Sequence, residues 1–262
     1  MILAEEAARS ARHQADHDSM TGLPNRRVLR ASIVDLAESG EPAGLLLLDI
    51  DNFKEINDTL GHDFGDEVLC RTAHRLAAVE GKALVARLGG DEFAIVVEGS
   101  RADVEAHAQR VIDVVRQTMS IEGTSMSIRI SVGMAHSESV AASSMLRFAD
   151  IAMYHAKRQG KNRHAWFEAT MESELQSRSR LEANIRKGIE KSEFIPFYQQ
   201  QIDLETGTLT GFEMLARWQS EELGLVSPDV FIPIAEDIGL ISDLSELLIA
   251  KSFEDAKQWD ES

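Results

Sequence analysis

The sequence is short of cysteine and of long apolar runs, and each shortage excludes a class of protein. Cys70 is the single cysteine among 262 residues, so the chain can form no internal disulfide, and we expect a cytoplasmic protein. The longest apolar run, around residues 45–48, is far too short to cross a bilayer, so we expect no membrane segment. Near the N-terminus, Glu5 and Glu6 stand where a signal peptide would have basic and apolar residues.

Basic residues are also scarce. The chain has 27 lysines and arginines against 44 aspartates and glutamates, which gives a net charge of −17. Because non-specific nucleic-acid binding depends on basic surfaces, we expect no nucleic-acid partner. A nucleotide substrate is not excluded, because a few local cations can hold a metal–nucleotide complex within an unfavourable overall field.

The apolar patterns of residues 18–170 predict an α+β domain. We expect a central strand at 45–50, a hairpin of strands at 84–88 and 93–97, and further strands at 126–134 and 164–167. Helices are expected at 26–38, 52–60, 66–79, 102–119 and 144–159, with a break at 61–65. Because the hairpin strands are antiparallel, we predict a mostly antiparallel or mixed sheet flanked by helices.

The remaining segments have different patterns. Residues 1–17 are typical of a polar helix, which we interpret as a signalling stalk that packs against a second copy or an upstream sensor domain. Residues 171–192 predict a charged linker helix. A new domain is expected over 193–262, with strands at 195–202 and 209–215 and a helix from about residue 241.

Acidic residues occur at two strand ends of the α+β domain. Asp49 and Asp51 end the central strand, and alternation predicts that they share one face. Taken alone, a metal ion and a salt bridge explain such carboxylates equally well. The hairpin turn Gly-Gly-Asp-Glu at 89–92 supplies further acids, Asp91 and Glu92. Acids that converge from different strand ends are typical of two-metal phosphoryl or nucleotidyl transfer.

Polar residues follow the central strand and are candidates for nucleotide binding. Lys54 lies at a strand-to-helix junction whose free N–H groups suit phosphates, although a solvated surface lysine is the simpler interpretation. Asn57 and Asp66 could pair with a guanine edge or could cap helices. Lys157 and Lys161, on either side of Gly160, could bind phosphates or complement a helix dipole.

These residues lie in motifs that resemble the GGDEF domains, the diguanylate cyclases. The resemblance covers about residues 16–170 and rests on the opening turn 18–27, the blocks 49–54 and 61–66, the hairpin 89–93 and the closing segments 131–135 and 149–162. It implies a fold similar to the palm of polymerases and adenylyl cyclases. It also implies condensation of two GTP into cyclic di-GMP with release of pyrophosphate. Because two half-sites must meet, it implies a homodimer.

The resemblance also implies a role for each matching residue. Asp49, the carbonyl of Ile50, Asp91 and Glu92 would hold Mg²⁺ (or Mn²⁺), and Glu92 would act as general base. The nucleotide would be bound by the main chain of Phe53 and by Lys54, Asn57, His62, Asp66, Lys157 and Lys161, with Lys54 stabilising charge in the transition state. Many family members carry an Arg-x-x-Asp feedback site, and the residues Glu80-Gly81-Lys82-Ala83 found here predict its absence. The aspartate at position 66 favours guanine over adenine.

Residues from about 179 to 262 resemble the start of an EAL phosphodiesterase domain. Glu213, Leu215 and Arg217 match its Glu-x-Leu-x-Arg motif, and the resemblance implies that Glu213 is a metal ligand. The family domain is a TIM-like barrel of about 250 residues. We therefore expect an incomplete barrel, an orphaned ligand, open strand edges and no phosphodiesterase activity.

Two functions remain open at this point. The first is an active diguanylate cyclase. The second is a GTP-binding regulatory module that controls an attached cyclic di-GMP phosphodiesterase, which the EAL-like segment favours. Formation of cyclic di-GMP from GTP and Mg²⁺ would distinguish them.

Overall fold

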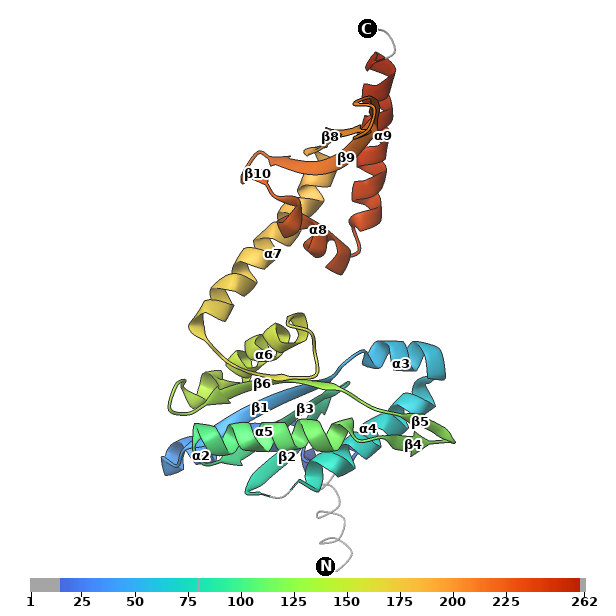
Figure 1. Cartoon of the computed structure of the whole chain (residues 1–262). Helices are drawn as coiled ribbons and strands as arrows, with labels where there is room; N and C mark the ends of the chain where they lie inside the picture. The colour runs from blue at the N-terminus through green and yellow to red at the C-terminus, as the bar shows by residue number, and fades with distance from the viewer. Residues whose placement is uncertain (1–14, 80, 260–262) are drawn as a thin grey trace, which may run out of the picture. The chain divides into compact units, whose positions relative to one another are not determined.

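The chain divides into two compact units between Glu172 and Ser173 (Figure 1). The structure is a computed structural model that describes residues 15–79 and 81–259. The predicted stalk helix lies mostly in residues 1–14, outside the described residues, and so does Glu80 of the feedback-site segment. Among the described helices, none is both long and apolar enough to span a bilayer.

The first unit is built on a five-stranded mixed sheet in the order β2-β3-β1-β6-β7. Its strands are β1 (Ala43–Ile50), β2 (Ala83–Gly89), β3 (Glu92–Glu98), β6 (Ile130–His136) and β7 (His164–Trp166). The central strand β1 is antiparallel to β3 and β6, and β7 is parallel to β6. A separate hairpin is formed by β4 (Met119–Ile121) and β5 (Thr124–Met126). The expected α+β class, with a mixed sheet, is confirmed.

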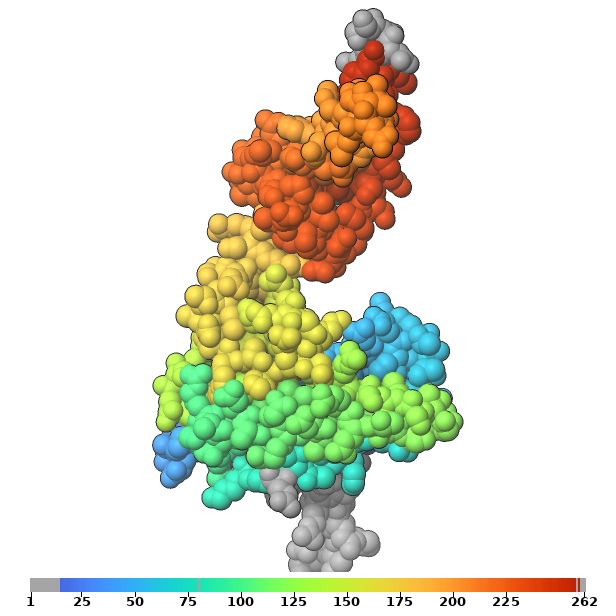
Figure 2. All heavy atoms as spheres, viewed as in Figure 1, coloured from blue at the N-terminus to red at the C-terminus, as the bar shows by residue number. Residues whose placement is uncertain are grey.

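Helices cover both faces of this sheet. They are α2 (Arg26–Ser39), α3 (Phe53–Leu60), α4 (His62–Ala77), α5 (Arg101–Arg116) and α6 (Ala142–Arg158). Helices α4 and α5 pack on one face, and α2 and α6 pack on the other. Figure 2 shows α5, in green, at the surface of the first face. Every residue of β1 is buried between the two layers, as its unbroken apolar run predicts.

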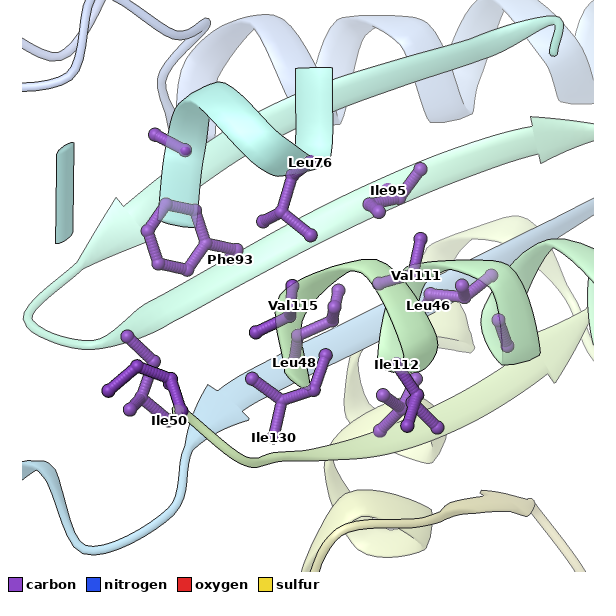
Figure 3. Close-up of a cluster of buried hydrophobic side chains, with 14 of the residues drawn as sticks. Leu46, Leu48, Ile50, Leu76, Phe93, Ile95, Val111, Ile112, Val115 and Ile130 are labelled. Carbon is purple, nitrogen blue, oxygen red and sulfur yellow. The ribbon is translucent and has the colours of Figure 1, made fainter. Parts of the chain in front are cut away.

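The core between α5 and the sheet is made of interlocking aliphatic side chains. Val111, Ile112 and Val115 of α5 form one buried cluster with strand residues that include Leu48 and Ile130 (Figure 3). A capping box at Ser100 fixes the start of α5, which sets the helix register that brings these residues to the sheet.

Helix α6 lies unusually close to β6. A Cβ at Gly133 would come within 1.9 Å of the Ala149 carbonyl oxygen and 2.2 Å of the Met153 amide nitrogen. Glycine at this position therefore sets the distance between α6 and the sheet. The same helix carries Lys157 in its last turn.

Three predicted elements differ from the structure. The strand expected at 126–134 is divided, because Met126 ends β5 and β6 begins at Ile130. Helix α4 begins at His62, inside the predicted break, because Gly61, with φ of 90°, is enough to redirect the chain. Helix α5 ends at Arg116, since Gln117 is no longer helical and Met119 pairs with Met126 in the β4–β5 hairpin.

The second unit contains an open antiparallel sheet in the order β10-β9-β8. Its elements are β8 (Phe194–Ile202), β9 (Leu209–Ser220), β10 (Gly224–Val226), α8 (Pro228–Asp237) and α9 (Ile241–Trp259), and α7 (Ala169–Glu190) spans the division between the units. Strand β10 and helix α8 were not expected from the sequence. Phe194, Trp218 and Phe231 form the centre of its core. In the described residues these strands do not close into a barrel.

Candidate active site

Two acidic residues meet across the central strands. Asp49 of β1 is directly opposite Glu92 of β3 in the antiparallel register, and residues opposite each other project from the same face. This is the face covered by α2 and α6, because the neighbouring Leu47 and Ala94 pack in that layer. Asp91 lies beside Glu92 in the turn. The structure thus brings together three of the four acids that the sequence analysis selected, and the fourth is Asp51.

A lysine neutralises the buried member of this group. The Nζ atom of Lys157 lies 2.7 Å from Oδ1 of Asp49, which is 9% exposed. Burial raises the pKa of Asp49 to about 6, Lys157 opposes the rise, and the charges of Asp91 and Glu92 add to it. Glu92 also faces a cation, because Arg26 of α2 lies 3.7 Å from its Oε2 atom.

Asp51 lies on the same face as Asp49, as alternation predicts, because its Oδ1 bonds to Ser131, the residue opposite Asp49 on β6, but it has partners of its own. Strand β1 ends at Ile50, and Asn52 turns the chain with φ of 61°. The carboxylate of Asp51 accepts hydrogen bonds from Ser131 Oγ (2.7 Å) and from the main-chain N–H of Asn162 (2.9 Å). Asp51 therefore ties the loop after α6 to the end of β1.

An arginine that the sequence analysis missed holds the Gly-Gly-Asp-Glu turn. Arg87 is 7% exposed and donates from Nε and NH2 to the carbonyl of Gly90 (3.2 and 2.7 Å). Its NH1 donates to Asp18 (2.9 Å), which also accepts from the N–H and hydroxyl of Thr21. Burial works against ionisation of Asp18, but the bonds from Thr21 and Arg87 leave its pKa lowered. The position of Arg87 just before the two glycines was the available signal.

Asn57 has an unused acceptor. Its Oδ1 atom is buried and has no hydrogen-bond partner among the described residues. The side chain lies against Gly65, where a Cβ would come within 1.9 Å of Oδ1. His62 and Asp66 are exposed and four residues apart on α4, so they share a side of that helix. The helix-cap interpretation of Asp66 fails, since Asp63 is the acid in the first turn of α4.

The remaining phosphate-binding candidates lie around the junction of β1 and α3. Phe53 begins α3, and Lys54 is exposed in its first turn. Lys161, in the loop after α6, donates from Nζ to Asn52 Oδ1 at 2.5 Å. A pocket of about 440 Å³ opens there, and Asn52, Glu55 and Lys161 are among its lining residues.

The donor set fits a hard divalent cation. No group of three His, Cys, Asp or Glu side chains able to hold a metal occurs within residues 15–79 and 81–259. Mg²⁺, however, is commonly held by one or two carboxylates together with water and substrate phosphates. Asp49 and Glu92 supply two carboxylates, and the main-chain carbonyl of Ile50 adjoins Asp49. The residues are therefore compatible with a magnesium ion that a nucleotide helps to bind.

Glu213 belongs to the second unit. It is exposed on β9, opposite Gln199 of β8. Alternation places it on the face of the sheet opposite to the buried Trp218. Glu213 therefore projects away from the core of that unit.

Comparison with known proteins agrees with the resemblance in the sequence. Residues 15–163 match the family model "Diguanylate cyclase, GGDEF domain", and residues 182–262 match the EAL domain model. The chain is 32% identical over 269 residues to MucR of Pseudomonas aeruginosa, a "bifunctional diguanylate cyclase/cyclic di-GMP phosphodiesterase". It is 35% identical over 252 residues to the cyclic di-GMP phosphodiesterase PdeR of Escherichia coli. These matches cover 98% and 94% of this chain, but 39% of MucR and 38% of PdeR.

Solved structures show the same relationship for the first unit. The GGDEF domain of YfiN (TpbB) from P. aeruginosa is 37% identical, with a TM-score of 0.58, over 61% of this chain and 99% of that one. The coiled coil and GGDEF domain of DgcB from Caulobacter crescentus, solved with c-di-GMP, is 28% identical, with a TM-score of 0.58. That match covers 63% of this chain and 92% of DgcB. The chain thus belongs to the GGDEF family of diguanylate cyclases, and an EAL-domain segment follows its GGDEF domain.

Proposed function

We propose that the chain is a magnesium-dependent diguanylate cyclase that condenses two GTP into cyclic di-GMP as a homodimer. The observation that carries this proposal is the cross-strand pair of Asp49 and Glu92, with Lys157 on the buried acid. A site with this arrangement has oxygen donors for a metal ion and a cation for phosphate in one place.

The reaction assigns a task to each side chain. Asp49, the Ile50 carbonyl, Asp91 and Glu92 would hold Mg²⁺ (or Mn²⁺), which when bound stabilises negative charge on the reacting phosphate. Glu92 would accept the proton of the attacking 3′-hydroxyl. The new bond joins that oxygen to the α-phosphorus of the second nucleotide, and the bond to the β-phosphate oxygen breaks as pyrophosphate leaves. A second transfer of the same kind closes the ring.

The nucleotide would be held by residues of α3, α4 and α6. Asn57 is half-buried at the end of α3, and its side-chain amide could pair with a guanine edge. Asp66 could accept two further N–H bonds from the guanine edge, and His62 lies on the same side of α4. The phosphates would be bound by Lys54, Lys161, Lys157 and the main chain at Phe53.

Catalysis requires two copies, because each half-site binds one nucleotide and the attacking hydroxyl must come from the other. The boundaries that we propose for the GGDEF domain are residues 18–170. The chain spans less than half of the length of the curated relatives described above. Control of this domain by a sensor, or of an EAL domain by it, is therefore a proposal about a longer protein.

The direct test is incubation of the purified chain with GTP and Mg²⁺ followed by quantification of cyclic di-GMP. Glu92→Gln should lower the rate by about a hundredfold or more, because the general base is removed, while GTP binding is retained. Glu98→Gln, an exposed change at the other end of the same strand, is the matched control and should leave the rate near that of the wild type.

The second candidate function is a GTP-binding regulatory module, and the observation that favours it is the EAL match at residues 182–262. Its signature is GTP binding without formation of cyclic di-GMP at protein concentrations that ensure dimers. That result would overturn the cyclase proposal and support the regulatory one.

A further inference from the structure

An ion pair joins Lys157 to Asp49, a carboxylate to which the proposed function assigns the metal ion. The two side chains, 31% and 12% exposed, come from different elements, α6 and β1, and their charged atoms are 2.7 Å apart. Asp91 and Glu92 lie close enough to influence the charge of Asp49. Lys157 is thus the cation that the buried carboxylate contacts directly among the described residues.

We propose that Lys157 is a resident counter-ion of Asp49, which it leaves for the nucleotide phosphates when the divalent cation binds. This inference rests on the proposed function and adds to it an exchange of the ionic partner of Lys157. Without nucleotide, a metal ion must compete with Lys157 for Asp49. With nucleotide, the phosphates give Lys157 a new anionic partner, and Asp49 becomes available to the metal.

The exchange explains why a lysine suits this position. A buried carboxylate without a counter-charge is strongly unfavourable, so Asp49 needs a cation whenever metal is absent. An ammonium on a flexible four-carbon stem can change partners while its helix stays in place, whereas a guanidinium favours a fixed, forked geometry. The close packing of α6 on Gly133 keeps that helix in place.

Other nearby cations do not fit this role. Lys161 bonds to the neutral side chain of Asn52. Arg26 is 3.7 Å from Glu92, and both of these side chains are substantially exposed, at 48% and 38%. Exposed pairs at such a distance contribute little. Of these three cations, Lys157 alone is in short contact with a buried carboxylate.

The first test measures binding of Mn²⁺ alone, by electron paramagnetic resonance, in the absence of nucleotide. Lys157→Met should bind Mn²⁺ about tenfold more tightly than the wild type, because the competing charged hydrogen bond is lost. A residue that served solely as a phosphate ligand would leave the affinity for the metal alone unchanged. Arg158→Met, which removes a positive charge from the exposed next position of α6, is the matched control and should have a much smaller effect.

The second test frees Lys157 by altering Asp49 and leaves Lys157 itself unchanged. In EDTA, Asp49→Asn should bind GTP more tightly than the wild type because it releases Lys157 for the phosphates. Asp91→Asn removes the same charge from the turn without releasing Lys157, so its gain in affinity should be clearly smaller.

The outcomes separate the inference from the proposed function. Equal Mn²⁺ affinities for wild type and Lys157→Met, or equal gains in GTP affinity for Asp49→Asn and Asp91→Asn, would overturn the exchange and leave the cyclase proposal intact. Absence of Mn²⁺ binding to the wild type even with a saturating non-reactive GTP analogue would overturn the metal site, and the exchange with it.

Discussion

The raised pKa of Asp49 makes the stability of the metal-free chain depend on pH. Its folded value of about 6 lies above the ordinary value of 3.8, so the folded state binds the proton more tightly than the unfolded state. Stability is therefore highest below the ordinary value and is lost as the pH rises through about 6. Relative to Asp49→Asn, the wild type should lose roughly 2 kcal/mol of unfolding free energy between about pH 4 and pH 7.

Urea unfolding at a series of pH values would measure this difference. Asp103 is a control of opposite sign, because hydrogen bonds from Ser100 lower its pKa. The wild type should therefore gain stability relative to Asp103→Asn as the pH rises through the acidic range. A difference between the wild type and Asp49→Asn that did not vary with pH would contradict the burial argument.

Arg87 provides a second prediction at the residue scale. Arg87→Ala would leave the Gly90 carbonyl and the Asp18 carboxylate without their shared donor. Loss of one member of a buried charge pair costs about 3–5 kcal/mol, and partial exposure of Asp18 (23% of its side chain) places the expected loss near the lower end. Lys82→Ala, which breaks an exposed pair just before the same strand, should cost less than about 1 kcal/mol. Equal urea midpoints for the two variants would refute the structural role of Arg87.

Residue types and spacing selected the acids of the candidate site but not the contacts within it. Asp49, Asp91 and Glu92 could be found because acids at strand ends are costly without a counter-charge. The partner of Asp49 is 108 residues away in the sequence (157 − 49), and no local pattern joins the two. Asp51 is on the predicted face, but its bonds from Ser131 and from the Asn162 main chain come from distant segments that no local pattern joins to it.

At the scale of elements, Gly133 fixes the distance between α6 and β6. Gly133→Ala would place a methyl group within 1.9 Å of the Ala149 carbonyl, so α6 must move outward, at a cost of about 1–3 kcal/mol. Because α6 carries Lys157, the affinity for GTP should fall as well. Thermal unfolding and GTP titration would measure both effects.

Gly211→Ala is the matched control, since the nearest atom to its Cβ would be 3.8 Å away and the backbone there is not in the left-handed region. It should change neither the melting temperature nor GTP binding appreciably. A Gly133→Ala variant with unchanged stability would mean that α6 does not need its close approach to the sheet.

Elements with a strong apolar period were predicted well, and those without one were not. The central strand and the hairpin follow directly from apolar runs and turn residues. The hairpin of β4 and β5 was missed because its short strands are defined by pairing with each other, between Met119 and Met126. Helix α8 contains Pro228 and Pro233, which obscure the helical pattern from sequence alone.

At the scale of the whole molecule, the strongly negative charge opposes the dimer that the proposed reaction needs. Two chains of charge −17 repel each other, and added salt screens this repulsion over a Debye length of about 10 Å at 0.1 M. At a protein concentration below the dimer dissociation constant, raising KCl from about 0.05 to 0.2 M should therefore increase cyclic di-GMP formation per chain. Salt also weakens the attraction between lysines and phosphates, so GTP affinity must be measured in the same series.

The same argument predicts how the rate depends on protein concentration. If the ring is formed between two half-sites, the rate per chain should fall in proportion to concentration on dilution below the dimer dissociation constant. The fraction of chains that bind GTP at saturation should not change, because each half-site binds its own nucleotide. Sedimentation velocity on the same samples would show whether the loss of rate follows the loss of dimer. A rate per chain that stays constant while the dimers dissociate would mean that one copy completes the reaction, and the two-half-site mechanism would be wrong.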